Sequence, residues 1–214
     1  MRGAPRQECP TPIPRTKKDV VTEFRTAEIL QAACRVFAEQ GFEQATMAEI
    51  ARVAGVAKGT LYLYYPSKQD IYWAALGRSL LELAAATRSQ VESAATAEQK
   101  VHAFIATKLR YFEEHRDFFR IYYSEVGRAL CRHGQAARQF DDLYLEQVKV
   151  LDQVLQHAVR RKAIRPIRTD ATAFALFDLT RSLVTQRLRG LSRASLDEDI
   201  EFAFDLAWKG IGHR

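Results

Sequence analysis

The sequence predicts an all-α protein. From Thr26 onward apolar residues recur with the 3.6-residue period of an amphipathic helix, and no segment alternates with period two for long enough to indicate a strand. Capping residues, glycines and prolines divide this pattern into about nine helices. The chain has 214 residues, of which 47% are hydrophobic and 27% are charged. These values are typical of a folded domain with a substantial core.

Composition excludes several classes of protein. The three cysteines, Cys9, Cys34 and Cys131, are odd in number and widely spaced, which excludes a disulfide framework and any CxxC zinc or redox motif. No apolar run approaches the ~18 residues of a membrane helix, and the N-terminus lacks the apolar stretch of a secretory signal. We therefore expect a cytoplasmic protein with no membrane partner, metal or cofactor. The net charge of +6 suits a nucleic-acid binder without establishing one.

The N-terminal region combines an irregular arm with a first helix. Residues 1–20 contain four of the six prolines and no periodic pattern, so we expect a disordered basic, proline-rich arm. The helix expected from Thr26 carries Ile29 and Phe37 on one apolar stripe. Gly41 then follows at a position typical of a C-terminal cap.

The stretch TMAEIARVAGVAKGTLYLY predicts two short helices joined by a tight turn. Thr46 and Glu49 have the spacing of a capping box at the start of the first helix. Gly55 ends that helix, because glycine readily adopts the left-handed conformation that such a turn can require. The second helix is expected over 58–64, since the residue before Pro66 avoids the helical region. This arrangement is typical of a helix-turn-helix unit.

One face of the second short helix is predicted to reach DNA. Ile50 and Leu61 are expected to point into a small core that holds the angle between the two helices. The opposite face would then present polar groups to base edges or phosphates in a major groove, with a glycine that permits close approach. These exposed residues are Lys58, Gly59, Thr60, Tyr62 and Tyr64.

The rest of the chain predicts a long fourth helix and five more. Ser67 is a suitable N-cap for the fourth helix, which is expected to end at about Ser89. Ser195, supported by Glu198, is expected to cap the last helix. The apolar patterns of these five helices span residues 101–112, 116–130, 140–158, 174–190 and 195–208.

The segment ILQAACRVFAEQGFEQATMAEIARVAGVAKGTLYLYYPSKQDIYWAAL closely resembles the N-terminal domain of the TetR family of transcriptional repressors. The shared features are a helix ending in GF, Thr46, the turn in IARVAGV, the GTLY sequence and an aromatic pair followed by PSK. The resemblance covers residues 26 to about 76. It implies a helix-turn-helix DNA-binding domain over 21–70 and a helical effector-binding and dimerisation domain over 71–214.

The resemblance also implies roles for individual residues at the DNA. The residues it places there are Thr46, Lys58, Gly59, Thr60, Tyr62, Tyr64 and Lys68. Among them Lys58 and Thr60 occupy reading positions, and the others hold phosphates or allow close approach. Thr46 could instead be only a helix cap, and Lys68 only a surface charge. Ala57 and Ala48 depart from the family pattern, so the protein is expected to rely partly on DNA shape.

For the larger domain, the resemblance implies a homodimer formed through the last two long helices. Such a dimer would bind a palindromic operator in double-stranded DNA, with half-sites ~34 Å apart. A small-molecule effector would release it. The candidate walls of the effector pocket are aromatic: Phe104, Tyr111, Phe119, Tyr122, Tyr123, Tyr144 and Phe177. Each of them could equally be a core residue. Arg110, Glu114, His115 and Arg181 could orient a ligand or lie on the surface.

An enzyme is not expected. The sequence contains no HExxH, no GxSxG and no phosphate-binding loop of P-loop spacing. Two alternatives to a regulator remain open at this point. One is a helical small-molecule-binding protein without specific DNA binding, and the other is an enzyme whose catalytic groups meet only in the folded chain.

Overall fold

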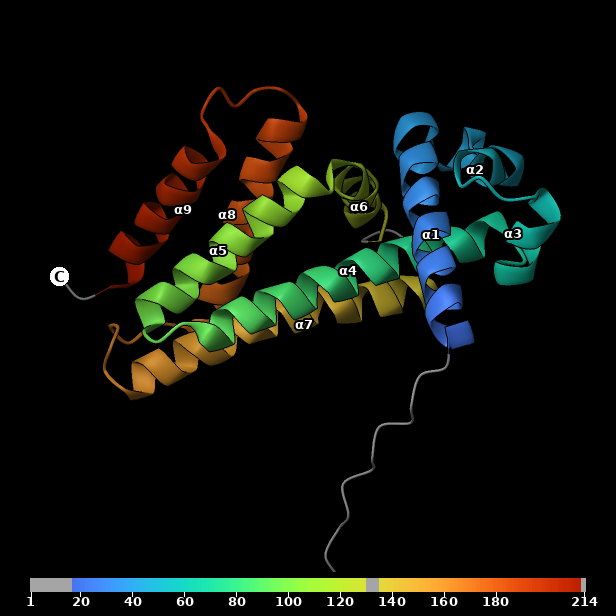
Figure 1. Cartoon of the computed structure of the whole chain (residues 1–214). Helices are drawn as coiled ribbons and strands as arrows, with labels where there is room; N and C mark the ends of the chain where they lie inside the picture. The colour runs from blue at the N-terminus through green and yellow to red at the C-terminus, as the bar shows by residue number, and fades with distance from the viewer. Residues whose placement is uncertain (1–16, 130–134, 213–214) are drawn as a thin grey trace, which may run out of the picture.

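The computed structural model describes residues 17–129 and 135–212, and within these ranges the secondary structure is entirely helical (Figure 1). This confirms the all-α prediction. The described helices are α1 Lys17–Gln44, α2 Met47–Val53, α3 Lys58–Tyr64, α4 Lys68–Ser93, α5 Ala97–Glu114, α6 Arg116–Ala129, α7 Gln135–Arg160, α8 Thr169–Leu188 and α9 Leu196–Ile211. None of them is long and apolar enough to cross a membrane.

The first helix differs from its prediction at its start. It begins at Lys17, upstream of Thr26 and inside the arm expected over 1–20, whose first 16 residues lie outside the described ranges. The last proline of the arm is at position 14, so no proline in residues 17–44 prevents helix formation. Gly41, with φ 75° and ψ 165°, interrupts α1 where a cap was expected.

The helix-turn-helix unit lies at one end of the molecule (Figure 1), and its buried residues belong to the core that continues into the other described helices. Ile50 of α2, Leu61 of α3 and Ile71 of α4 are fully buried. The ring of Tyr72 meets the rings of Phe37 and Phe42 edge-on, each with centroids 4.9 Å apart. Helix α4 therefore contributes its first turns to the same core as α1 and α2.

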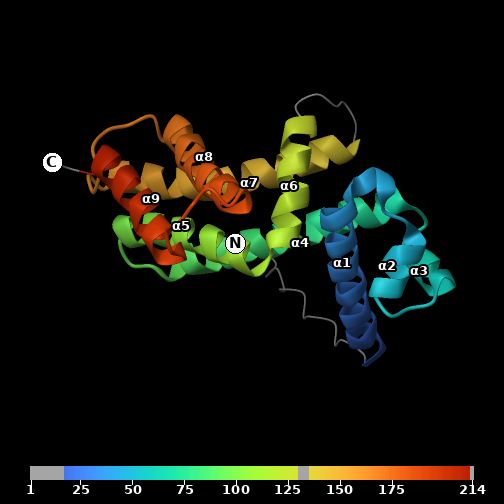
Figure 2. The ribbon, with the colours of Figure 1, turned by 90° about the horizontal axis from the view of Figure 1, so that it is seen from above.

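The larger domain is arranged around α5. This helix packs against α4, α7, α8 and α9, while α4 and α7 run side by side (Figures 1 and 2). Phe104 and Phe112 of α5, Phe119 of α6 and Phe177 of α8 are the largest fully buried side chains. Helix α6 also packs against α1, so the two domains meet along α1, α4 and α6.

An arginine fixes the connection between α8 and α9. Nη1 of Arg187 donates hydrogen bonds to Oδ2 of Asp199 at 2.7 Å and to the carbonyl oxygen of Ala194 at 3.0 Å. Helix α9 then begins with the capping box predicted for Ser195 and Glu198: the serine hydroxyl accepts from the Glu198 amide, and the glutamate accepts from the Ser195 amide. The last two helices are therefore held together at their shared end.

Candidate nucleic-acid interface

Thr46 caps α2, but only half of the predicted capping box forms. Its hydroxyl accepts a hydrogen bond from the Glu49 amide at 3.2 Å. The Glu49 carboxylate does not return to the Thr46 amide. It accepts instead from Arg52, one turn further on, at 2.7 and 3.0 Å, and these hydrogen bonds lower the pKa of Glu49. The charged guanidinium is a stronger donor than a backbone amide, which explains the difference.

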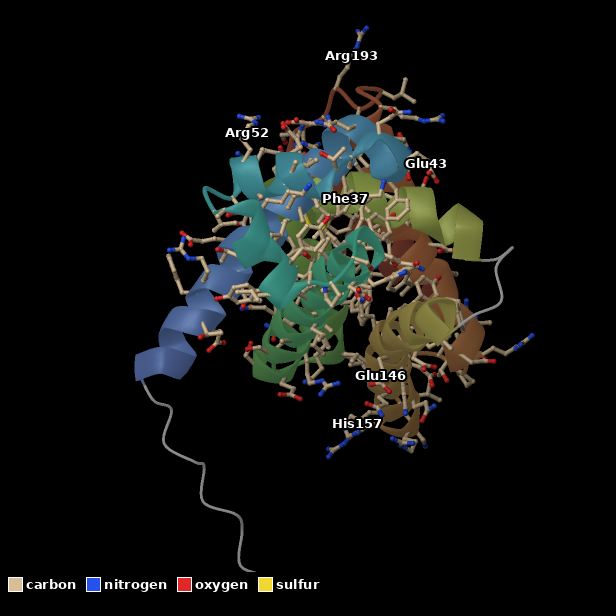
Figure 3. All side chains as sticks on the ribbon, turned by 90° about the vertical axis from the view of Figure 1, so that its right-hand side faces the viewer. Phe37, Glu43, Arg52, Glu146, His157 and Arg193 are labelled. Atoms are coloured by element: carbon tan, nitrogen blue, oxygen red, sulfur yellow. The ribbon has the colours of Figure 1, made fainter. Side chains whose placement is uncertain are left out.

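The turn between α2 and α3 has the predicted geometry. Gly55 has φ 66°, in the left-handed region, and Val56 packs partly buried against the core. Ala57 is the N-cap of α3 and offers no side-chain hydrogen bond. Figure 3 shows Arg52 at the outer edge of α2 and Phe37 between the helices.

Helix α3 carries five of the residues predicted to face DNA within its seven residues. Burial of Leu61 turns Lys58, Gly59 and Tyr62 to the solvent. The Lys58 amine lies 5.9 Å from the centroid of the Tyr62 ring. Two further residues are half-buried: Thr60, and Tyr64, which packs against the core. A DNA contact by any of the five stays a prediction.

Lys68 lies at the start of α4, as predicted, but its amine is engaged within the protein. Nζ donates hydrogen bonds to the carbonyl oxygens of Phe42 at 2.6 Å and Glu43 at 3.0 Å, and lies 4.6 Å from the centroid of the Phe42 ring. Two of the three donors of the ammonium group are used in this way. Lys68 therefore joins α4 to the end of α1, and its expected phosphate contact remains a prediction.

The N-terminal part of the chain, which contains the helix-turn-helix unit, matches a known family model. Residues 29–75 match the model of the bacterial regulatory proteins of the tetR family. This segment therefore matches the N-terminal domain of the TetR family. The fatty acid metabolism regulator protein of Bacillus subtilis is 34% identical over 79 residues, which are 37% of this chain and only 41% of that protein. The transcriptional activator FasR of Mycolicibacterium smegmatis is 25% identical over 194 residues, covering 88% of this chain and 84% of FasR.

Solved structures extend the likeness to the whole fold. FadR from Bacillus halodurans and FadR from Bacillus subtilis, the latter in complex with stearoyl-CoA, each give a TM-score of 0.75 at 22% identity. Each match covers 86% of this chain and 98% of that chain. The larger helical domain therefore has the same fold as these two regulators, although the family model covers only the N-terminal part.

The aromatic residues predicted to line an effector pocket in the larger domain form two ring clusters. In the first, Phe177 contacts Phe104 and Tyr144, with centroids 6.4 and 4.7 Å apart. The second cluster is centred on Phe119 and contains Tyr111, Tyr122 and Tyr123. Four of the seven residues are buried and three are half-buried: Phe104, Phe119, Tyr122 and Phe177, then Tyr111, Tyr123 and Tyr144. Whether any of them touches a ligand stays a prediction.

Two hollows lie elsewhere on the described part of the TetR-family fold. The larger, of about 650 Å³, is lined by charged and apolar residues of α1, α4 and the α5–α6 turn, with Glu114 and His115 among them. The smaller, of about 360 Å³, lies between α4, α5 and α7. None of the seven predicted aromatic residues lines either hollow. Of the other polar candidates, Arg110 pairs with Asp197 and Arg181 with Asp178.

Two residues that the sequence analysis did not select stand out in the structure. Leu63 of α3 is 85% exposed, on the outward side of the helix. Lys108 of α5 is 4% exposed, with its amine 2.9 Å from the centroid of the Phe177 ring. Burial lowers the pKa of Lys108 well below its usual range. Both had a signal in the sequence: Leu63 lies two positions after a core leucine, and Lys108 interrupts the apolar stripe of its helix.

Proposed function

We propose that the chain is a ligand-responsive repressor that binds a palindromic operator in double-stranded DNA as a homodimer. The observation that carries this proposal is the outward face of α3, held by buried Leu61 within the segment that matches the tetR-family model. We keep the proposed division of the chain into a DNA-binding domain over 21–70 and an effector-binding domain over 71–214. Helix α4 crosses that boundary. The named relatives are regulators, which supports a role in transcription control.

Exposed apolar side chains on the last two helices support the proposed dimer. Phe174 of α8 and Phe202 and Leu206 of α9 are all exposed. Clustered apolar residues of this kind on a monomer surface are typical of protein–protein interfaces. Dimerisation also has a physical reason, because two recognition helices related by a twofold axis read a palindrome, whereas one seven-residue helix reads only a few base pairs.

The proposed effector is a small molecule with an apolar body, taken up among the aromatic clusters of α5 to α8. Relatives named for fatty acid metabolism, and the FadR complex with stearoyl-CoA, support this class of compound. Release would follow if the effector binds a conformation in which the two recognition helices are wrongly spaced for DNA. The contacts of α1 with α4 and α6 give this change a route to the DNA-binding domain.

Selection of random duplex DNA on the purified chain tests the proposal. We expect a palindrome whose half-sites lie one helical turn or a multiple of it apart, bound with an affinity that falls steeply with salt. Recovery of no preferred sequence would contradict it and favour a small-molecule-binding protein without specific DNA binding. A reporter placed behind the selected operator distinguishes repression from activation, which matters because FasR is an activator.

A further inference from the structure

Two buried polar side chains stand among the rings of the larger domain. Lys108 of α5 is 4% exposed and Gln147 of α7 is 2% exposed. Within the described residues the Lys108 amine lies against the ring faces of Phe104 and Phe177. Both the amide nitrogen and the amide oxygen of Gln147 lack a hydrogen-bond partner.

These two side chains lie on helices that meet at one aromatic cluster, because α5 carries Lys108, α7 carries Gln147 and both pack against α8. The Lys108 amine lies 2.9 Å from the centroid of the Phe177 ring, and the Tyr144 ring packs edge-on against Phe177 at 4.7 Å. Gln147 follows Tyr144 by three positions in α7, and residues at this spacing are neighbours on a helix surface. The lysine therefore contacts the Phe177 ring directly, and the glutamine lies one turn from Tyr144, which packs on the same ring.

Among the described residues, the carboxylate that acts on the Lys108 amine already has other partners. Asp178, a carboxylate that acts electrostatically on Lys108, is bonded to Arg181 at 3.1 Å and accepts from the Tyr144 hydroxyl at 3.5 Å. Burial of an amine and an amide without partners is costly, and folded proteins rarely leave such groups unsatisfied. An aromatic cluster with a few converging polar groups is the usual composition of a small-molecule site.

We propose that the effector of this domain is a carboxylic acid with an apolar body, bound through its carboxylate to the Lys108 amine and the Gln147 amide nitrogen. The body of the molecule packs among Phe104, Tyr144 and Phe177. A carboxylate fits because its two oxygens accept from both donors at once and its charge pairs with an ammonium group. This inference rests on the proposed effector response and names the chemistry of its site.

Isothermal titration of the full-length chain with matched probes tests this assignment. The probes are octanoate, decanoate and 4-phenylbutanoate, each compared with the alcohol of the same skeleton. We expect at least one acid to bind about tenfold to a hundredfold more tightly than its alcohol, the range for hydrogen bonds to a charged group. Absence of any such preference in the unmodified chain overturns the proposal.

Variants identify the residues responsible. Lys108→Met should abolish the preference for the acid and keep the affinity for the alcohol, because methionine fills a similar volume without charge. Gln147→Leu should weaken acid binding about fivefold. The control is Lys149→Met, which removes an exposed lysine of α7. Acid preference that survives in both Lys108→Met and Gln147→Leu overturns the assignment. Operator binding of the unmodified chain and of Lys149→Met without ligand is measured in parallel, which separates this result from failure of the proposed function.

An independent observation concerns the centre of the outward face of α3. In a helix, positions two before and two after a residue lie about 160° away from it on either side. Because Leu61 is fully buried, Gly59 and Leu63 occupy the middle of the opposite face. Leu63 is 85% exposed, and the space in front of Gly59 is open. The most outward side chain of the helix is therefore apolar.

We infer that Leu63 reads thymine methyl groups in the operator. Thymine alone presents a methyl group at the edge of the major groove, and an apolar side chain recognises it by contact. Gly59, one turn earlier, has no side chain to keep the backbone from the base edges. This inference also rests on the proposed function.

Replacement of each thymine of the selected operator by uracil, which lacks only the methyl group, tests the contact. Burial of ~40 Å² of apolar surface corresponds to about a fivefold loss of affinity at one or two positions. Leu63→Ala should lose the same affinity and become insensitive to uracil at those positions. Leu191→Ala, at another exposed leucine, is the control. Equal uracil sensitivity with and without Leu63, or none at all, overturns the inference, whereas failure to select any operator contradicts the proposed function.

Discussion

Replacement of Arg187 by methionine should destabilise the larger domain substantially. The arginine side chain is 13% exposed and joins three segments of the chain. Nη1 binds the Asp199 carboxylate at 2.7 Å and the Ala194 carbonyl at 3.0 Å, while Nη2 lies 3.4 Å from Glu113 of α5. The variant would remove all of these contacts and leave the Asp199 carboxylate without its charged partner.

The expected loss follows from what remains around Asp199. Its side chain is 8% exposed, and without the arginine its remaining recorded partner is the Ser192 hydroxyl, at 3.2 Å. Removal of one partner of a buried ion pair costs about 3–5 kcal/mol, because the other charge stays buried and uncompensated. Methionine replaces part of the packing of the arginine stem, so we expect a loss of about 3 kcal/mol in the free energy of unfolding.

Urea denaturation at neutral pH and fixed protein concentration measures this loss. A double-mutant cycle with Asp199→Asn should show coupling, with the double variant at least ~1 kcal/mol more stable than additivity predicts. Arg168→Met is the matched control, because its ion pair with Asp170 is exposed and should be worth less than ~1 kcal/mol. Additive costs, or a loss for Arg187→Met no larger than that of the control, would refute this reasoning.

Three further predictions concern the backbone, the thiol and the lysines. Gly41→Ala should cost about 1–3 kcal/mol of stability, because alanine is strained at the φ of 75° and ψ of 165° that Gly41 adopts. Gly77 lies inside α4 with open space around it, so Gly77→Ala should stabilise the protein by up to ~1 kcal/mol. Thermal unfolding compares the two variants. Burial raises the pKa of Cys34 to about 12, so in a variant with this single cysteine the native thiol should resist alkylation at pH 8 and react in urea. Its contribution to stability should be lost as pH rises above ~8.5, where the unfolded thiol ionises. Lys68→Met should cost about 1–2 kcal/mol of folding free energy, because it removes the hydrogen bonds to the end of α1. Lys58→Met should leave stability unchanged and lower the slope of log affinity for the operator against log salt concentration by ~1. Equal effects of the two variants on stability would contradict the assigned contacts.

The helices could be predicted where local signals mark both ends. Helix α3 occupies residues 58–64 as expected, because the left-handed Gly55 and the constraint before Pro66 lie within a few residues of its ends. The predicted start of α1 at Thr26 was wrong. The prediction used the first apolar periodicity at Thr26, whereas the polar, helix-forming residues before it extend the helix back to Lys17. An apolar stripe identifies the buried face of a helix but not the length of its exposed end.

Partners of individual side chains were harder to predict than their positions. The sequence placed Lys68 at the start of α4 but gave no sign that its amine would bind carbonyl groups at the end of α1, because those residues are distant along the chain. Glu49 had two possible donors, and only the folded geometry selected Arg52. The outward direction of α3, by contrast, followed from the single core residue Leu61.

The hydrogen bonds from Lys68 to the end of α1 determine how a movement of α4 would change the position of the proposed DNA-binding helices. The first turn of α4 is hydrogen-bonded to the last turn of α1 and shares a core with α2. If α4 tilts, we expect α1, α2 and α3 to move with it as a rigid unit. The internal angle between α2 and α3 is left untouched. In the proposed dimer, regulation would change the distance between the two DNA-binding domains. The affinity of each domain for a single half-site would stay the same.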